Sequence, residues 1–236
     1  MLTRFLLMPI SAKFVQKSIV LFFLLLIPIL PAYAQIESNP SVRMESVDVP
    51  YEKFNVISSN ANSGSFENEH TRNWQLNIKN QIAYANPQGN AVIRLYDGED
   101  RTKFIEIGMS SPPDMKFWVA VQNPEVGYAV LHDQKETGWN RDDEIIAVYA
   151  DDVGLTIHNG KRIVVSNLSL DYYKIKDFSV YGMESSTDPL ATNSGDFILN
   201  IVSGNPAANP LFYLPYMLAG IFGVIIVILL KTKKRN

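Results

Sequence analysis

Residues 91–122, AVIRLYDGEDRTKFIEIGMSSPPDMKFWVAVQ, indicate the fold class of this chain more strongly than any other stretch of its sequence. They contain three short runs rich in β-branched and aromatic residues, at 91–96, 103–109 and 116–122. Asp, Gly, Ser and Pro residues separate the runs. Runs of this kind, bounded by turn-forming residues, are typical of β-strands. The stretch therefore predicts three consecutive strands.

The same pattern recurs on both sides of this stretch. Further strands are predicted near 53–58, 74–83, 127–132, 144–150, 154–158, 161–166, 168–173, 175–181 and 196–202. Between two of them, Asn159 and Gly160 predict a tight hairpin turn, because both residues adopt positive φ readily. About a dozen short strands, with turns between them and no long helical period, predict an all-β antiparallel β-sandwich of jelly-roll type.

Both ends of the sequence differ from this middle part. A basic and then apolar stretch ends in small residues around Ala34, which predicts a cleaved signal peptide over 1–34; an uncleaved first membrane helix is the alternative. Residues 211–230 form a mostly apolar, uncharged run that would span ~30 Å as a helix, the thickness of a bilayer core. Four of the six residues in 231–236 are basic, which predicts that this tail is cytoplasmic.

These features predict a single-pass protein of the cell membrane, with its N-terminal domain outside and its C-terminus in the cytoplasm. Between the signal peptide and the transmembrane helix, the sequence predicts three segments. They are an extended arm over 35–50, the β-sandwich over 51–202 and a short stalk over 203–210.

Charge and cysteine content exclude several classes of function. The predicted exported part, 35–210, contains 14 basic and 24 acidic residues, so its net charge is 14 − 24 = −10. A surface this acidic repels phosphate backbones, which argues against nucleic acid as a partner. The chain has no cysteine, so zinc–thiolate sites, thiol catalysis and blue-copper centres are excluded.

The strand sequences over about 74–182, including KFIEIGM, FWVAVQ, GLTIHNGKR and DFSVYG, resemble those of concanavalin A-like jelly rolls, in particular the laminin-G group. The resemblance implies a binding module for glycans or proteins, in some members assisted by calcium. Glycoside hydrolases of the same fold place several acidic residues alternately along one strand. Here Glu106 stands alone between Ile105 and Ile107, so their catalysis does not follow from the resemblance.

Acidic side chains at predicted strand ends are the candidate metal ligands. Calcium needs six to eight oxygen ligands, which here would come from separate loops. Solvated turns explain the same residues without a metal, and no other cofactor is predicted. The candidates are Asp97, Glu99, Asp100, Asp151 and Asp152.

Aromatic residues divide into core and binding candidates. Trp74 and Trp118 lie within apolar strands and are predicted to be core residues. Trp139 and Arg141 lie in a predicted loop and are the candidate binding anchors, because an indole offers a stacking face and a guanidinium a planar set of donors. The alternative for Trp139 is that it folds back over the end of the core.

Three further positions are candidates for modification or assembly. Asn167 begins the Asn-Leu-Ser sequon and is predicted to face outward, where it could accept a glycan. Ala219 and Gly223 lie four residues apart in the predicted transmembrane helix, a spacing that permits close helix packing and a helix-mediated oligomer.

The sequence therefore predicts a membrane-anchored β-sandwich that binds an envelope glycan or an envelope protein, and that is not an enzyme. An accessory subunit of a membrane complex, assembled through the single helix, is the alternative. An extracytoplasmic hydrolase is the third hypothesis, with the least support in the sequence.

Overall fold

The computed structural model describes residues 42–71, 73–98, 100–170, 172–204, 216, 218–223 and 225. Residues 42–204 form one compact unit, separate from the rest of the chain. The predicted signal peptide, most of the predicted stalk and the basic tail lie outside the described residues.

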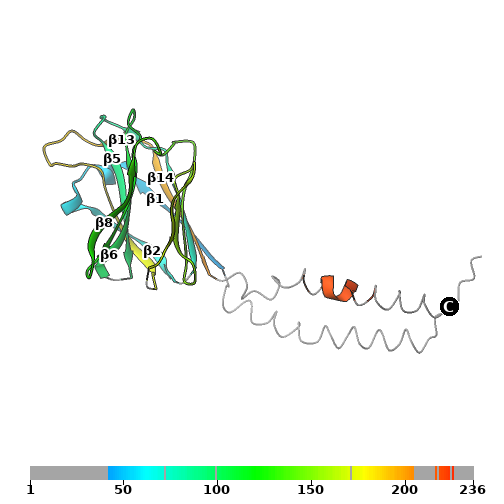
Figure 1. Ribbon diagram of the computed structural model, residues 1–236. Helices are drawn as coiled ribbons and strands as arrows, with labels where there is room; N and C mark the ends of the chain where they lie inside the picture. The colour runs from blue at the N-terminus through cyan, green and yellow to red at the C-terminus, as the bar shows by residue number, and fades with distance from the viewer. Residues whose placement is uncertain are drawn as a thin grey trace, which may run out of the picture. The chain divides into compact units, whose positions relative to one another are not determined.

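Two six-stranded antiparallel sheets form the compact unit and lie face to face (Figure 1). Sheet I has the strand order β1-β14-β3-β9-β10-β11, and sheet II has the order β2-β12-β5-β6-β7-β8. The strands of sheet I are β1 (Val42–Pro50), β14 (Asp196–Gly204), β3 (Trp74–Asn80), β9 (Ile145–Ala150), β10 (Gly154–His158) and β11 (Ile163–Leu168). Those of sheet II are β2 (Asn62–His70), β12 (Ile175–Tyr181), β5 (Asn90–Asp97), β6 (Asp100–Ser110), β7 (Phe117–Asn123) and β8 (Gly127–Gln134). The smaller elements are η2 (Tyr51–Phe54), η3 (Ser58–Asn60), and the pair β4 (Ala83–Tyr84) and β13 (Thr192–Ser194). The predicted antiparallel sandwich is confirmed.

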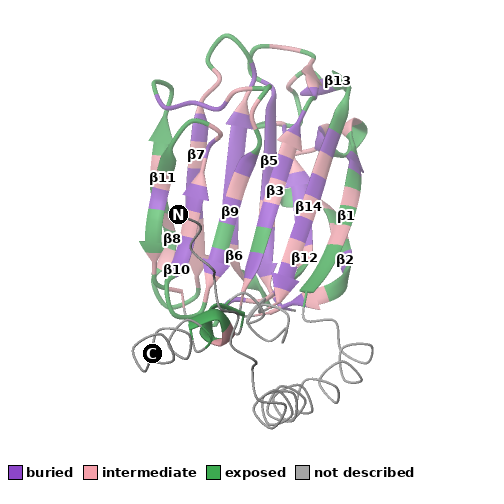
Figure 2. Cartoon of the chain, turned by 90° about the vertical axis from the view of Figure 1, so that its right-hand side faces the viewer, coloured by how far each residue is buried: buried purple, intermediate pink, exposed green. Residues whose placement is uncertain are grey.

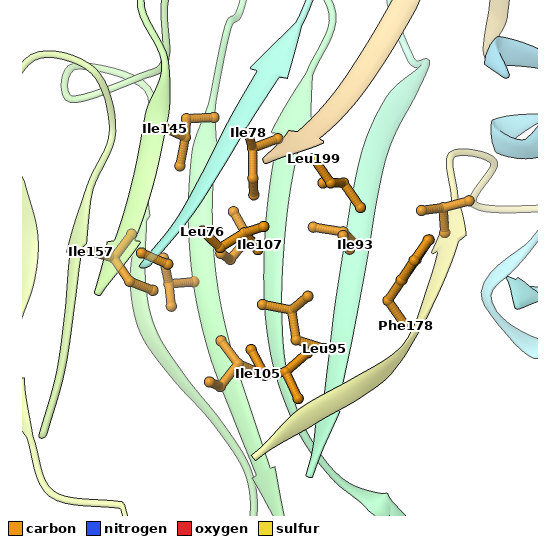
Figure 3. Close-up of a cluster of buried hydrophobic side chains, with 14 of the residues drawn as sticks. Leu76, Ile78, Ile93, Leu95, Ile105, Ile107, Ile145, Ile157, Phe178 and Leu199 are labelled. Atoms are coloured by element: carbon orange, nitrogen blue, oxygen red, sulfur yellow. The ribbon is translucent and has the colours of Figure 1, made fainter. Parts of the chain in front are cut away.

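The core lies between the two sheets and is formed largely by side chains at alternate positions of the strands. In β3, Trp74, Leu76 and Ile78 are buried and alternate with more exposed residues, as Figure 2 shows for the strands of sheet I. Ile93 in β5 and Ile107 in β6 meet them from sheet II (Figure 3). Full burial of an aliphatic side chain of this size contributes roughly 1.5–3 kcal/mol, so this layer stabilises the sandwich.

Residues 42–50 belong to the sandwich, although the sequence predicted an extended arm over 35–50. They form β1, which pairs with the last strand from Val42 opposite Gly204 to Pro50 opposite Asp196. Val49 is buried in the core. Pro50 ends the strand, at a position where its missing N–H is tolerated. The described unit accordingly runs over 42–204 and not over the predicted 51–202.

Two predicted strands are absent, and besides β1 the strands β2 and β13 were not predicted. Residues 53–58 fall largely in short 3-10 turns, because Phe54 turns into the core against Phe197, with ring centroids 4.8 Å apart. In the predicted strand 168–173, Leu168 ends β11, and the described residues 169, 170, 172 and 173 are not in a strand. Strand β2 has the polar sequence NSGSFENEH, whose lack of β-branched residues hid it from a sequence pattern.

The predicted Asn159-Gly160 hairpin turn is longer than two residues. Strand β10 ends at His158 and β11 begins at Ile163. Gly160 has the expected positive φ of 91°, but Asn159 is fully buried and accepts hydrogen bonds from the backbone N–H groups of Lys161 and Arg162. The asparagine therefore organises a four-residue turn with its side chain.

Within the predicted transmembrane segment, residues 216, 218–223 and 225 are helical. Ala219 and Gly223 are exposed in this helix. No helix formed by the described residues has both the length and the apolar character needed to cross a bilayer.

Candidate functional site

A cluster of polar and aromatic side chains lies on the outer face of sheet II, the face that points away from the core. In β6, Ile105 and Ile107 point into the core, so Glu106 points outward. The strand register places Glu106 opposite Arg94 of β5 on one side and opposite Ala120 of β7 on the other. Alternation therefore brings side chains from neighbouring strands together around this glutamate.

Glu106 is 3% exposed and its carboxylate accepts four hydrogen bonds. Oε1 accepts from Tyr128 OH at 2.8 Å and from Trp118 Nε1 at 3.3 Å. Oε2 accepts from Arg94 Nε at 2.8 Å and from Tyr181 OH at 3.0 Å. Four strands thus supply one donor each to a single buried acceptor. A buried carboxylate with this number of partners fixes their orientation, because each lost bond would leave a polar group unpaired.

The charges in this cluster compensate each other. Burial opposes the positive charge of Arg94, but its hydrogen bond to Glu106 raises the pKa of the guanidinium above its ordinary value. The guanidinium carbon also lies 4.9 Å from the ring centroid of Phe104 and 4.7 Å from that of Tyr181. Burial, and then the adjacent carboxylate, raise the pKa values of the Tyr128 and Tyr181 phenols. Both phenols therefore stay protonated and continue to donate.

Trp118 lies directly over Gly108 of the neighbouring strand. The register pairs the two residues, and a Cβ atom added to Gly108 would overlap the indole ring. The absence of a side chain at this position is what allows the ring to lie against the sheet. The indole is partly exposed, so the prediction that Trp118 is a core residue is wrong.

A groove of about 680 Å³ lies over this cluster. Its volume is within the range of small-ligand sites, roughly 300–1,000 Å³. Trp118, Tyr128 and Tyr181 line it together with polar side chains from strand ends and loops. The other lining residues are Ser58, Pro87, Gln88, Asn90, Val92, Ser110, Asp114, Lys116, Val130, Asp133, Lys135, Met183 and Glu184. Aromatic surface next to hydrogen-bonding groups is the composition expected of a site for a polyhydroxylated ligand.

The predicted anchors Trp139 and Arg141 do not line this groove. Trp139 is 2% exposed and its Nε1 donates to the backbone oxygen of Ser110 at 2.9 Å. It therefore closes the end of the core, as the alternative stated for it predicted, and it does not offer a stacking face. Arg141 donates through Nη2 to the backbone oxygen of Gln81 at 2.6 Å, so part of its guanidinium is already engaged in a hydrogen bond within the domain.

Those predicted calcium ligands that the structure describes are not gathered into a site. Among the residues that the structure describes, no group of three or more acidic or histidine side chains could hold a metal ion. Asp97 forms an ion pair with Lys103 at 2.6 Å, and Asp100 accepts from the backbone and hydroxyl of Thr102. Asp151 and Asp152 are exposed in the β9–β10 turn, and Glu99 lies outside the described residues.

Other predictions about side-chain orientation agree with the structure. Asn167 is exposed in β11 with a positive φ of 53°, so its side chain is accessible as predicted; its glycosylation stays a prediction. Tyr172 is 52% exposed and Tyr173 is 1% exposed, so one ring faces outward and the other inward.

A second buried polar cluster, not predicted from the sequence, contains His70. Its Nδ1 lies 2.7 Å from Ser203 Oγ, and its Nε2 lies 3.4 Å from Glu45 Oε2. This set of side chains has the composition of a hydrolase triad. However, His70 is fully buried and Ser203 is 6% exposed, so the hydroxyl is not accessible to a substrate. The cluster instead links β2 of sheet II to β1 and β14 of sheet I.

In the sequence Glu106 stands alone, with no second acidic residue after it on the strand, so the pattern gives it no catalytic role. A signal for Trp118 was present in the sequence. Trp118 and Gln122 occupy alternate positions along β7, and Phe117 and Val119 occupy the positions between, which alternation assigns to the core.

The solved structures that resemble this chain share little sequence with it. No protein-family model and no curated protein matches the chain. A β-fructofuranosidase from Schwanniomyces occidentalis is 13% identical, with a TM-score of 0.42 over 70% of this chain and 35% of that chain. A prokaryotic β-1,3-1,4-glucanase (lichenase) from a mouse hindgut metagenome is 10% identical, with a TM-score of 0.39 over 70% and 83% of the two chains. The carbohydrate-binding module CBM66 from Bacillus subtilis is 8% identical, with a TM-score of 0.34 over 66% and 92%.

These likenesses concern the fold alone, and this chain spans about a third of the fructofuranosidase. The neighbours are jelly-roll sandwiches, as the resemblance to concanavalin A-like domains predicted. Several of them are glycoside hydrolases, which contradicts the expectation that this protein is not an enzyme.

Proposed function

We propose that this protein is a carbohydrate-active sandwich that holds a glycan in the groove over sheet II. The observation that most supports the proposal is the position of Trp118, whose indole lies over Gly108 and lines the groove. The apolar face of a sugar ring stacks on such a surface, and aromatic side chains with nearby donors are typical anchors.

The rest of the groove suits the hydroxyl groups of a sugar. The amide groups of Gln88 and Asn90 belong to residues that line the groove. Lys116 and Asp133, which also line it and form an ion pair, supply a donor and an acceptor side by side. Sugar hydroxyls both donate and accept, so they can pair with each of these groups.

The hydrogen bonds to Glu106 should also favour tight binding, because they preorganise the aromatic side chains of the groove. They hold Trp118, Tyr128 and Tyr181 in place before any ligand arrives. Ordering a side chain on binding costs roughly 0.5–1.5 kcal/mol, so a preorganised aromatic surface avoids part of that cost.

The test is a glycan array probed with the full chain, followed by titration calorimetry on the glycans that bind. Trp118→Ala should weaken binding at least about tenfold, equivalent to ~1.4 kcal/mol. Tyr172→Ala is the matched control, because that exposed aromatic residue does not line the groove. Equal binding by the wild type and Trp118→Ala, or an array on which nothing binds, would reject the proposal.

The same incubations should be analysed for cleavage, since catalysis occurs on this fold. New reducing ends that disappear in Asp133→Asn or Glu184→Gln would assign hydrolysis to carboxylates of the groove. Unchanged glycan after long incubation would assign the groove to binding.

We also propose that residues 211–230 anchor the sandwich to the outer face of the cell membrane. The apolar run and the basic tail over 231–236 support this proposal. Protease added to intact cells should then remove the domain over 42–204, and a fully protected domain would contradict the topology. Native mass measurement in detergent addresses the alternative of a membrane-complex subunit: a mass above one chain that falls with Gly223→Ile would favour assembly through the helix.

A further inference from the structure

We infer that the ligand of this groove is a neutral glycan and that the groove rejects polyanionic ones. The inference rests on the proposed function, and it concerns the charge of the ligand, which the proposed function leaves open. It is based on two ion pairs and one additional carboxylate in the groove lining.

The two lysines of the lining are each paired with an aspartate that also lines the groove. Lys116 Nζ lies 2.7 Å from Asp133 Oδ1 across the β7–β8 ladder. Lys135 Nζ lies 2.7 Å from Asp114 Oδ2. A sulfate or carboxylate group of a ligand could approach either ammonium only next to the carboxylate that already neutralises it.

The remaining charges of the lining do not favour an anion either. Glu184 adds a third carboxylate, so the described lining has three acidic and two basic side chains. Arg94, beneath the aromatic residues, is already paired with the buried Glu106 at 2.8 Å. The whole segment 35–210 is also acidic, with 14 basic against 24 acidic residues, which repels a polyanion before contact.

Neutral hydroxyl groups, unlike anionic groups, can form favourable hydrogen bonds with the two ion pairs. A paired ammonium and carboxylate present donors and acceptors side by side, and a hydroxyl can accept from the first while it donates to the second. The pairs are partly exposed, since the side chains of Lys116 and Asp133 are 36% and 44% accessible, so a ligand can reach them. The ion pairs thus serve as hydrogen-bonding groups for neutral sugars and as a barrier to charged ones.

The inference is tested with the full chain and soluble polysaccharides of both kinds at ~10 mM and ~150 mM salt, where the Debye lengths are about 30 Å and 8 Å. The neutral probes are a β-glucan, an α-mannan, a galactan and a fructan; the anionic probes are polygalacturonate, alginate and dextran sulfate. Binding to at least one neutral polymer and to none of the anionic ones is the expected result. Binding to an anionic polymer as tight as to any neutral one would overturn the inference while glycan binding stands. Binding to no polymer, neutral or anionic, would reject the proposed function itself.

A charge variant tests the two ion pairs directly. Asp114→Asn combined with Asp133→Asn frees both lysines and raises the net charge by two. The control, Asp142→Asn combined with Asp152→Asn, makes the same change in charge at exposed positions that do not line the groove. The groove variant should gain binding to dextran sulfate by roughly fivefold or more over the control, and the gain should disappear at ~1 M salt, where the Debye length is about 3 Å. If both variants gain equally, or neither gains while both melt like the wild type, the ion pairs do not set the selectivity.

Discussion

Trp118 Nε1 lies 3.3 Å from Glu106 Oε1, so an indole that lines the groove is held from below by a buried carboxylate. The same oxygen accepts from Tyr128 OH at 2.8 Å. The hydrogen bond fixes the rotation of the indole about its side-chain bonds, and Gly108 beneath the ring gives it room. The orientation of the main predicted contact surface thus depends on two residues of β6 that need not touch the ligand.

Glu106→Gln should therefore weaken glycan binding by altering Trp118. The amide oxygen can keep the hydrogen bond from Arg94, and the amide NH₂ can donate to Tyr128, whose hydroxyl also accepts. The indole N–H can only donate, so it would face another donor and lose its partner. The expected result is a loss of affinity of about tenfold, ~1.4 kcal/mol, in titration calorimetry.

The control for Glu106→Gln is the double variant with Trp118→Ala. If the glutamate acts through the indole, its substitution should cost little further affinity once the indole is absent. Additive losses in the two variants would show that Glu106 acts on the ligand by another route.

Gly108→Ala should displace the indole without removing it. The added methyl group would occupy space that the ring of Trp118 now fills, so the ring must move outward and its hydrogen bond to Glu106 must break. We expect weaker glycan binding and a changed tryptophan near-UV circular dichroism signal, with the strand content unchanged. Gly127→Ala is a control for glycine substitution itself, since an added Cβ there meets no atom within 4 Å, although its φ of 88° adds local strain. A Gly108→Ala protein that binds as the wild type does would contradict the proposed role of the ring.

Trp139→Ala should mainly reduce stability, whereas Trp118→Ala should mainly reduce glycan binding. Trp139 is 2% exposed and fills the end of the core, so its truncation should cost ~3–5 kcal/mol of the free energy of unfolding. Trp118 lies on the outer face, so its truncation should affect binding far more than stability. Urea denaturation and glycan titration of both variants measure the two effects, and a greater stability loss for Trp118→Ala would contradict the assignment of faces.

The β-sandwich could be predicted from the sequence because most of its strands contain apolar residues at every second position. Strand β2 could not, since only Phe66 and His70 of its nine residues are buried and the rest is polar. Strand β1 was hidden in a similar way by its charged residues and its terminal proline. These strands are recognisable through their partners: β1 pairs with β14 and β2 with β12.

The site was harder to predict because its parts are far apart in the sequence. Arg94 and Tyr181 are 87 residues apart and meet only through the order β12-β5-β6. The position of Trp139 in a loop did not show that the residue is buried. The segment after β8 folds back, and the backbone N–H of Trp139 donates to the backbone oxygen of Met115. A pattern in one sequence gives the face of a side chain but not the identity of its neighbours on other strands.

The buried cluster around His70 should make the stability of the sandwich depend on pH. Burial lowers the pKa of His70 below its ordinary value near 6.5, and Arg43 acts in the same direction, while Glu45 opposes the shift. His70 therefore binds a proton at a higher pH in the unfolded chain than in the folded one. Its contribution to the free energy of unfolding is complete above about pH 6.5 and decreases as the pH falls below that value. One proton changes this free energy by at most about 1.4 kcal/mol per pH unit.

Two other groups near this range must be separated from His70. The pKa of His132 is also lowered, first by burial and then by Arg162, so it contributes in the same window. Although burial opposes the shift, hydrogen bonds from the backbone of Glu67 and Asn68 lower the pKa of Glu45, whose effect begins only below about pH 4.5. Urea denaturation between pH 7.5 and 5 should therefore show a slope that decreases in His70→Gln, decreases in His132→Gln and nearly vanishes in the double variant. An unchanged slope in His70→Gln would mean that the histidine linking the two sheets does not titrate with folding.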